Sequence, residues 1–178
     1  SVALTGWALD DVEVESVTIY LRQGSTYNPI GTAVLAEGPR PEVEKTYPGY
    51  PFHYQSGWGY MMLSNYLPNK GNGTFKLVAI ARDSSGKETV LGSRTLNADN
   101  ANGTKPFGAI DTPDQGGEAS GSSFKNWGWV LTPRPKRIPT DGSTIKVFID
   151  GEFAGRPVYN LYRADIARYF PGSANTGG

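Results

Sequence analysis

The chain carries two versions of one sequence pattern, about 122 residues apart. Residues 40–49 read arginine, acid, β-branched apolar residue, aromatic, proline and glycine, and residues 163–172 repeat that order at an offset of 123. The pattern Gly-Trp-x-Leu occurs at residues 6–9 and again at 128–131, an offset of 122. Because self-similarity at such a period indicates a repeated structural unit, the sequence predicts two domains of the same fold.

The second copy of this unit is shorter than the first. A chain of 178 residues holds only about one and a half units of this length. Residues 107–121, which lead into the second Gly-Trp pattern, have no counterpart before Ser1, and residues 58–97 have none after Gly178. We therefore expect either a piece of a longer repetitive polypeptide or a subunit whose missing strands come from elsewhere.

Composition favours a β protein rich in turns. Aromatic residues make up 12% and charged residues 19% of the chain, which also holds 23 glycines and 13 prolines. Basic and acidic residues number 17 each, so no basic field is expected to hold a phosphate backbone, and nucleic acid is not an expected partner. The chain has no cysteine, which excludes disulfides, thiolate metal sites and cysteine nucleophiles. No apolar run approaches the roughly 20 residues of a membrane helix, so no membrane insertion is expected.

Short segments of alternating apolar and polar residues, separated by turn residues, predict strands. In the first unit they lie at 2–9, 12–21, 30–35, 61–67, 75–82 and 89–96, with a tight hairpin loop at 83–87. Proline at a first helical position and acids in the first turn predict a short helix at 41–47. In the second unit, strands are expected at 107–113, 124–131 and 145–149, with a longer loop at 132–139.

Three passages resemble the bacterial immunoglobulin-like (Big-type) repeats of extracellular and cell-surface proteins. They are residues 117–122 with the Gly-Trp-Val-Leu strand that follows, the Gly-Trp-Ala-Leu-Asp strand at 6–10, and the Ala-x-Ala-Arg-Asp-x-x-Gly-Lys-x-Thr hairpin at 79–89. The resemblance implies tandem β-sandwiches along a secreted or wall-attached bacterial protein, and it implies no catalytic residue. The short helix near Arg40 is an insertion that generic repeats of this kind lack.

The expected architecture is all-β, with two immunoglobulin-like sandwiches in tandem and a short helical insertion in each. The first domain spans 1–98 and lacks its first strand, 99–106 is a polar linker, and 107–178 begins a second domain that lacks its last strands. Changes of length between the two copies fall in loops, which supports one fold for both.

No catalytic, cofactor or metal site is predicted from the residue types. The chain has one histidine, His53, which lies among aromatic residues without the Gly-x-Ser-x-Gly pattern of a nucleophile elbow. A triad built on His53 is weighed against a loop histidine without chemistry. The acids Asp10, Asp11, Glu13 and Glu15 form either calcium ligands or a solvated face, and their alternating spacing on a strand favours the second.

An aromatic loop is the best candidate for contact with another molecule. Tyr50, Phe52, Tyr54 and Trp58 fall within eleven residues rich in glycine and proline. Exposed rings of this kind stack on sugars or on a neighbouring subunit, and such residues are enriched at the centres of interfaces. The alternative is that Trp58 begins a core strand.

Two further kinds of residue are singled out by position. Arg40 and Arg163, like Trp7 and Trp129, occupy matching places in the two units. An arginine at a helix start opposes the helix dipole, so each is expected to pair with a carboxylate or to cap strand carbonyls. Asn72 and Asn102 lie in glycosylation acceptor patterns.

The sequence therefore predicts a non-catalytic, extracellular or cell-surface structural or adhesive module that needs no cofactor. Its expected partners are copies of itself or adjacent repeats, arranged head to tail, and glycans. A more specific form of this hypothesis is that neighbouring subunits donate the missing strands and build a fibre. The alternative is a carbohydrate-binding accessory module of a secreted glycan-active enzyme, with a coplanar row of rings in the aromatic loop.

Overall fold

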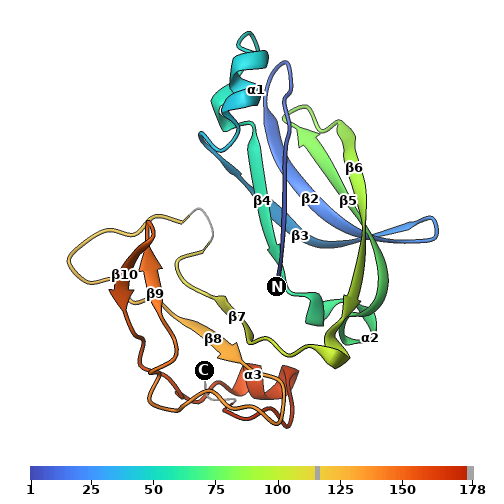
Figure 1. Cartoon of the computed structure of the whole chain (residues 1–178). Helices are drawn as coiled ribbons and strands as arrows, with labels where there is room; N and C mark the ends of the chain where they lie inside the picture. Colours follow the sequence, from blue (N-terminus) through green and yellow to red (C-terminus); the bar gives the residue numbers. More distant parts are fainter. Residues whose placement is uncertain (115–116, 176–178) are drawn as a thin grey trace. The chain divides into compact units, whose positions relative to one another are not determined.

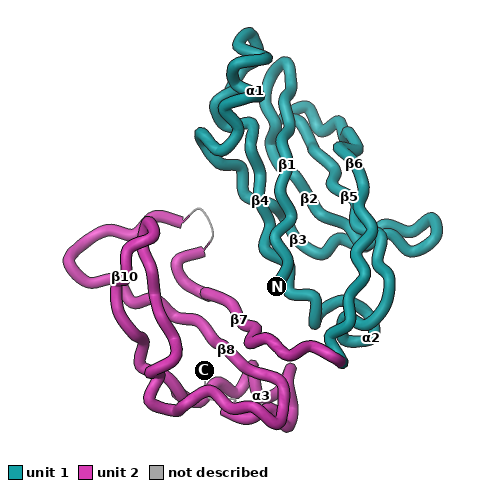
Figure 2. Tube along the Cα trace, in the orientation of Figure 1, with its two compact units in different colours: residues 1–101 teal, residues 102–178 magenta. Residues whose placement is uncertain are grey.

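The computed structural model describes residues 1–114 and 117–175. The chain divides into two compact units, unit 1 at residues 1–101 and unit 2 at residues 102–178 (Figure 1, Figure 2). The division falls inside the segment 99–106 that the sequence predicts as a linker. Residues 115–116 and 176–178 of the predicted second domain lie outside the described residues.

Unit 1 is built on one antiparallel sheet of six strands in the order β1-β4-β3-β2-β5-β6. The strands are β1 Val2–Trp7, β2 Val14–Gln23, β3 Thr26–Ala36, β4 Gly57–Met62, β5 Asn72–Asp83 and β6 Glu88–Asp99. The helical segments are α1 Pro41–Thr46, η1 His53–Gln55, η2 Ser64–Tyr66 and α2 Pro68–Gly71. Strands β1 and β6 are the two edges of the sheet.

The sheet curls, so that strands far apart in its order share one core (Figure 1). Val17 and Ile19 of β2 are buried with Ala81 of β5, and Leu4 of β1 and Trp58 of β4 pack against them. A neighbouring cluster holds Leu21, Met62, Leu67, Phe75 and Leu77. The alternation of apolar residues along β2 thus produces one buried face, as period-two spacing requires.

Two local predictions for unit 1 are confirmed. The helix expected at 41–47 is α1, with Pro41 in its first turn. The hairpin loop expected at 83–87 joins β5 to β6, where Asp83 N donates to Lys87 O over 3.0 Å. Asp83 Oδ1 also accepts from the Ser85 hydroxyl and from the N–H groups of Lys87 and Ser85. These hydrogen bonds hold the pKa of the Asp83 carboxyl below its usual value.

The described residues of unit 2 form two small antiparallel sheets and a helix. The pairs are β7 Phe107–Ile110 with β8 Gly128–Leu131, and β9 Val147–Ile149 with β10 Glu152–Gly155. The helix is α3 Ala164–Tyr169, and η3 Asn100–Asn102 precedes the unit. The buried apolar residues of this unit are Trp129, Leu131, Ile138, Tyr159 and Ile166.

The all-β class predicted from the sequence is confirmed, whereas several strand ends differ from the expected ones. The strand expected at 2–9 ends at Trp7, because Asp10 Oδ1 accepts hydrogen bonds from Val12 N and Glu13 N and so forms a turn. The strand expected at 124–131 begins only at Gly128. Before it, Trp127 N donates to the Thr112 hydroxyl instead of to a strand carbonyl, over 2.7 Å.

Candidate interaction site

The two copies of the sequence repeat form the same local structure. In unit 1 the rings of Trp7 and Tyr47 lie 6.0 Å apart, and in unit 2 those of Trp129 and Phe170 lie 5.3 Å apart. After each helix, the aromatic residue donates its backbone N–H to the carbonyl of the helix residue four positions earlier. Tyr47 N donates to Val43 O of α1, and Phe170 N donates to Ile166 O of α3, over 2.9 Å in both units. Both of these helix residues are buried.

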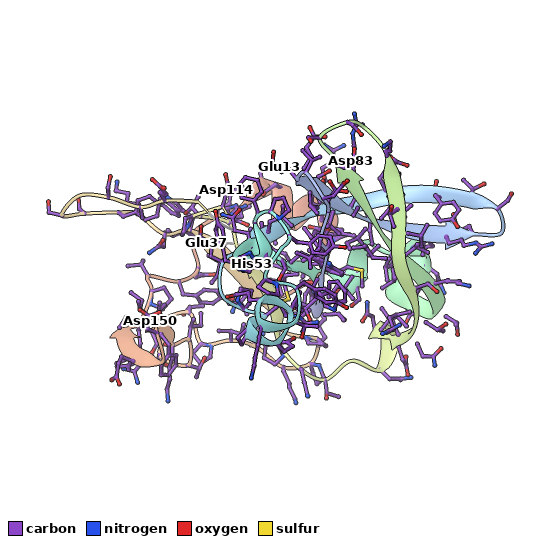
Figure 3. The ribbon with its side chains drawn as sticks, turned by 90° about the horizontal axis from the view of Figure 1, so that it is seen from above. Glu13, Glu37, His53, Asp83, Asp114 and Asp150 are labelled. Carbon is purple, nitrogen blue, oxygen red and sulfur yellow. The ribbon has the colours of Figure 1, made fainter. Side chains whose placement is uncertain are left out.

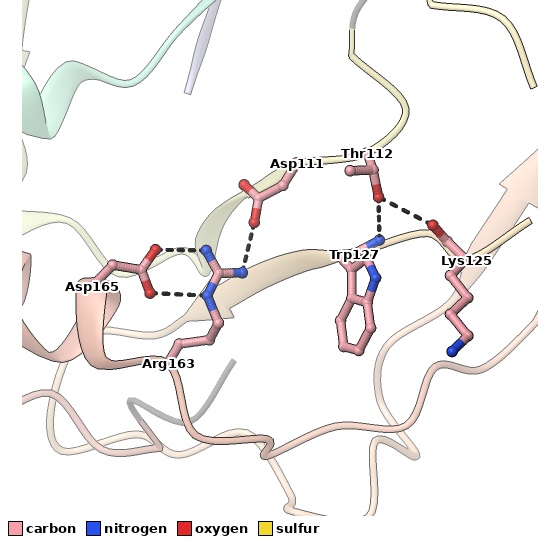
Figure 4. A network of polar contacts seen from close by, with 6 residues as sticks. All are labelled: Asp111, Thr112, Lys125, Trp127, Arg163 and Asp165. Atoms are coloured by element: carbon pink, nitrogen blue, oxygen red, sulfur yellow. Dashed lines mark hydrogen bonds and ion pairs between the residues drawn. The ribbon is translucent and has the colours of Figure 1, made fainter.

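The repeated arginines also occupy matching places. Arg163 precedes α3 and donates to both carboxylate oxygens of Asp165, with Nε–Oδ1 at 2.9 Å and NH2–Oδ2 at 2.6 Å (Figure 4). It also donates to Asp111 Oδ2 over 2.6 Å. The hydrogen bonds from Arg163 lower the pKa of the Asp165 carboxyl to about 2.

Arg40 has only part of this arrangement. Its Nε forms an ion pair with Glu42 Oε1 over 3.3 Å. The Nε atom is buried and makes no hydrogen bond within the described residues, so the ion pair lacks hydrogen-bond geometry. The Asp111 partner of Arg163 follows β7, and unit 1 as described has no strand in the place of β7.

The free edge of β1 is defined by its hydrogen bonds to β4. Ala8 N donates to Ser56 O over 2.9 Å at the end of a ladder in which Trp7 faces Gly57. Since hydrogen-bonded and non-hydrogen-bonded pairs alternate in an antiparallel ladder, the backbone N–H and C=O groups of Thr5 and Trp7 point away from β4. No strand of the described chain pairs with that edge.

A groove runs beside this edge. It has a volume of about 570 Å³ and lies between β1, at Ala3–Trp7, and β6, at Leu91–Arg94. Its floor includes Ile19, Leu77 and Ala79, and Arg40 and Trp58 also line it. Trp58 Nε1, like Arg40 Nε, is buried and has no hydrogen-bond partner in the described structure. The groove therefore combines an apolar lining with the arginine side chain of the sequence repeat.

The aromatic loop presents three accessible rings. Tyr50, Phe52 and Tyr54 are 44%, 45% and 42% exposed. The planes of Phe52 and Tyr54 are tilted by 58°, so these two rings share no common plane. Trp58 lies apart from them on β4, half-buried, with its ring over Gly6.

His53 and the acids form no common centre. His53 Nδ1 lies 3.0 Å from Tyr50 O, and because a carbonyl only accepts, this nitrogen is the protonated one. Figure 3 shows His53, Glu13, Glu37 and Asp83. His53 lies in η1, Glu13 precedes β2, Glu37 follows β3, and Asp83 ends β5. Within residues 1–114 and 117–175, no three histidine or acidic side chains gather as metal ligands would.

The two acceptor asparagines differ in their surroundings. Asn72 begins β5, donates to Asn69 O over 2.9 Å and accepts from Ala101 N over 2.7 Å. Its amide is therefore already used to hold the α2 turn. Asn102 is exposed at the end of η3. Glycosylation at either position stays a prediction.

Sequence reasoning singled out Arg40, Arg163, Trp7 and Trp129 as repeat residues, but it did not find the groove or the pairing of Arg163 with Asp111. The recurring arginine was the sequence signal that could have indicated this pair, because it stands where a helix start disfavours a cation.

None of the helices in the described residues is long and apolar enough to cross a membrane. Comparisons with protein-family models, curated proteins and solved structures found no match for this chain.

Proposed function

We propose that the chain is a non-catalytic structural or adhesive module, built from two immunoglobulin-like units of a bacterial extracellular or cell-surface protein. In this proposal neighbouring subunits in a fibre supply the strands that complete both units. The resemblance to Big-type repeats and the repeated Trp-helix-Arg structure support this role.

The observation that carries the proposal is the exposure of apolar strand residues in unit 2. Leu21 of β2 is 5% exposed, whereas Ile149, its counterpart in β9 at an offset of 128, is 62% exposed. Val147 and Phe148 beside it are also exposed. A strand that is apolar but uncovered, in a two-stranded sheet, exposes edges that pair readily with other chains.

Electron microscopy and sedimentation of the full chain test the proposal. Addition of strands from one copy to the next is an open, heterologous contact, which builds filaments. We expect ordered filaments or concentration-dependent oligomers. A chain that stays monomeric at high concentration contradicts completion by neighbouring subunits. A native polypeptide of mass well above 19.2 kDa with further repeats favours a tandem array instead.

A carbohydrate-binding module is the second candidate, favoured by the exposure of Tyr50, Phe52 and Tyr54. The tilt between Phe52 and Tyr54 does not match the flat row of rings that stacks on an extended polysaccharide. Affinity electrophoresis in polysaccharide gels distinguishes the two roles. Retardation that is lost in Tyr50→Ala and Tyr54→Ala, and kept in Tyr20→Ala, would favour the carbohydrate role.

A further inference from the structure

We propose that the free edge of β1, together with the groove beside it, is the docking site for one kind of partner: an extended segment with the pattern of residues 107–111, Phe-Gly-Ala-Ile-Asp. The segment lies antiparallel to β1, and its aspartate pairs with Arg40. This inference rests on the proposed structural role and adds which edge is used, by what sequence and in what register.

The hydrogen-bond pattern of unit 2 identifies the edge. Asp111 N donates to Trp127 O over 2.8 Å, and the same register pairs Ala109 with Trp129. By the alternation of antiparallel ladders, Trp129 directs its backbone groups toward β7. Its counterpart Trp7 directs the same groups away from β4. The position of β7 in unit 2 is therefore the unoccupied edge of β1 in unit 1.

The exposure of the repeated tryptophans agrees with this assignment. Trp129 is 6% exposed, and the ring of Phe107 from β7 packs on it at 6.0 Å and on Phe170 at 5.3 Å. Trp7 is 41% exposed, although it keeps its own helix-side partner Tyr47. A phenylalanine from the partner, in the place that Phe107 takes in unit 2, would cover Trp7.

The positive charge of Arg40 indicates which end of the partner segment carries an acidic residue. In unit 2 Asp111, which directly follows β7, accepts from Arg163 over 2.6 Å. In unit 1 the counterpart Arg40 lines the groove, and its Nε pairs with Glu42, which stands where Asp165 stands in unit 2. Among the described residues, no carboxylate takes the place of Asp111 beside Arg40. A guanidinium beside an apolar strand edge therefore fits a segment that ends in a carboxylate.

The test uses the full chain and a synthetic peptide of residues 105–113. Amide hydrogen exchange is followed by NMR on the labelled chain with and without peptide. We expect the N–H groups of Thr5 and Trp7 to gain protection, while those of Leu4 and Gly6, already directed at β4, change little. Protection at Trp129 instead, without change at Trp7, means that the peptide only displaces β7 and overturns the proposal.

Matched peptides test the two recognition elements. A peptide with Asp111→Asn keeps the apolar strand and is expected to bind about tenfold more weakly, as loss of a charge-assisted hydrogen bond implies. A peptide with Ala109→Pro loses a ladder N–H and is expected not to bind. Equal binding by all three peptides, or binding of none, contradicts the inference.

Variants of the chain complete the test. Arg40→Gln should bind the original peptide about tenfold more weakly and should no longer distinguish it from the Asp111→Asn peptide. Thr5→Pro removes a backbone N–H that faces the free edge and should abolish binding; if this variant fails to fold, the peptide series on the original chain decides. Filaments without peptide binding would refute this inference alone, and peptide binding by a strictly monomeric chain would refute fibre assembly alone.

Discussion

At the scale of single residues, Arg163 is the most informative side chain. It lies between Asp111, in the loop after β7, and Asp165, in the first turn of α3, and donates to both. The bond to Asp165 is bidentate, which is the geometry in which arginine is hardest to replace by lysine. This residue therefore joins the strand pair of unit 2 to its helix.

The pH dependence of this pair is a direct prediction. Arg163 lowers the pKa of Asp165 to about 2, below the usual value of 3.8. A carboxyl whose pKa is lower in the folded state stabilises that state above its usual pKa, and this contribution is lost as the pH falls from about 4 to about 2. Asp165 is half exposed, so the effect is small. NMR titration should give a midpoint near 2, and one near 3.8 in Arg163→Gln.

A titration of Asp165 that does not respond to Arg163→Gln would show that the pair does not form in solution.

At the scale of elements, β9 is the proposed counterpart of β2 at an offset of 128 in the sequence, and the two strands lie in different surroundings. β2 lies between β3 and β5, whereas β9 pairs only with β10. Leu21→Ala is expected to lower the free energy of unfolding by about 3 kcal/mol, as for a buried leucine. Ile149→Ala should change it by about 0.5 kcal/mol or less, as for an exposed residue. Urea unfolding of the full chain measures both.

A large loss for Ile149→Ala would mean that β9 is covered in solution, either within unit 2 or by another copy. Repeating the measurement at several protein concentrations separates these cases, since only stabilisation by another copy depends on concentration.

The strands show which parts of the fold could be predicted from the sequence. Alternation predicted strands in the places of β1, β2, β3, β5 and β6, most clearly in β2, where every second residue of its central part is buried. It placed the strand after β3 from Met61 on, whereas β4 spans Gly57–Met62. It overestimated the strands around residues 107–113 and 124–131, where Thr112 and Trp127 form side-chain hydrogen bonds in place of a regular ladder. The groove and the Arg163–Asp111 pair were not predictable, because they depend on which edge each strand uses.

At the scale of the whole molecule, we propose that one structural plan occurs twice and that strands of other copies complete each unit. Repetition was visible in the sequence, and the Trp7–Tyr47 and Trp129–Phe170 contacts agree with it. Among the described residues, no strand pairs with the free edge of β1, whereas β7 pairs with β8, and the strands of unit 2 form two-stranded sheets only.

Residue-resolved amide hydrogen exchange of the full chain, at a dilution where it is monomeric, tests this claim most directly. Amides in a strand that is paired on both sides exchange slowly, and those in an uncovered pair exchange fast. We predict slow exchange in β2 and β5 and fast exchange in β9, β10 and at Thr5 and Trp7. Exchange in β9 as slow as in β2, or protection of Thr5 and Trp7 in the monomer, would contradict the account.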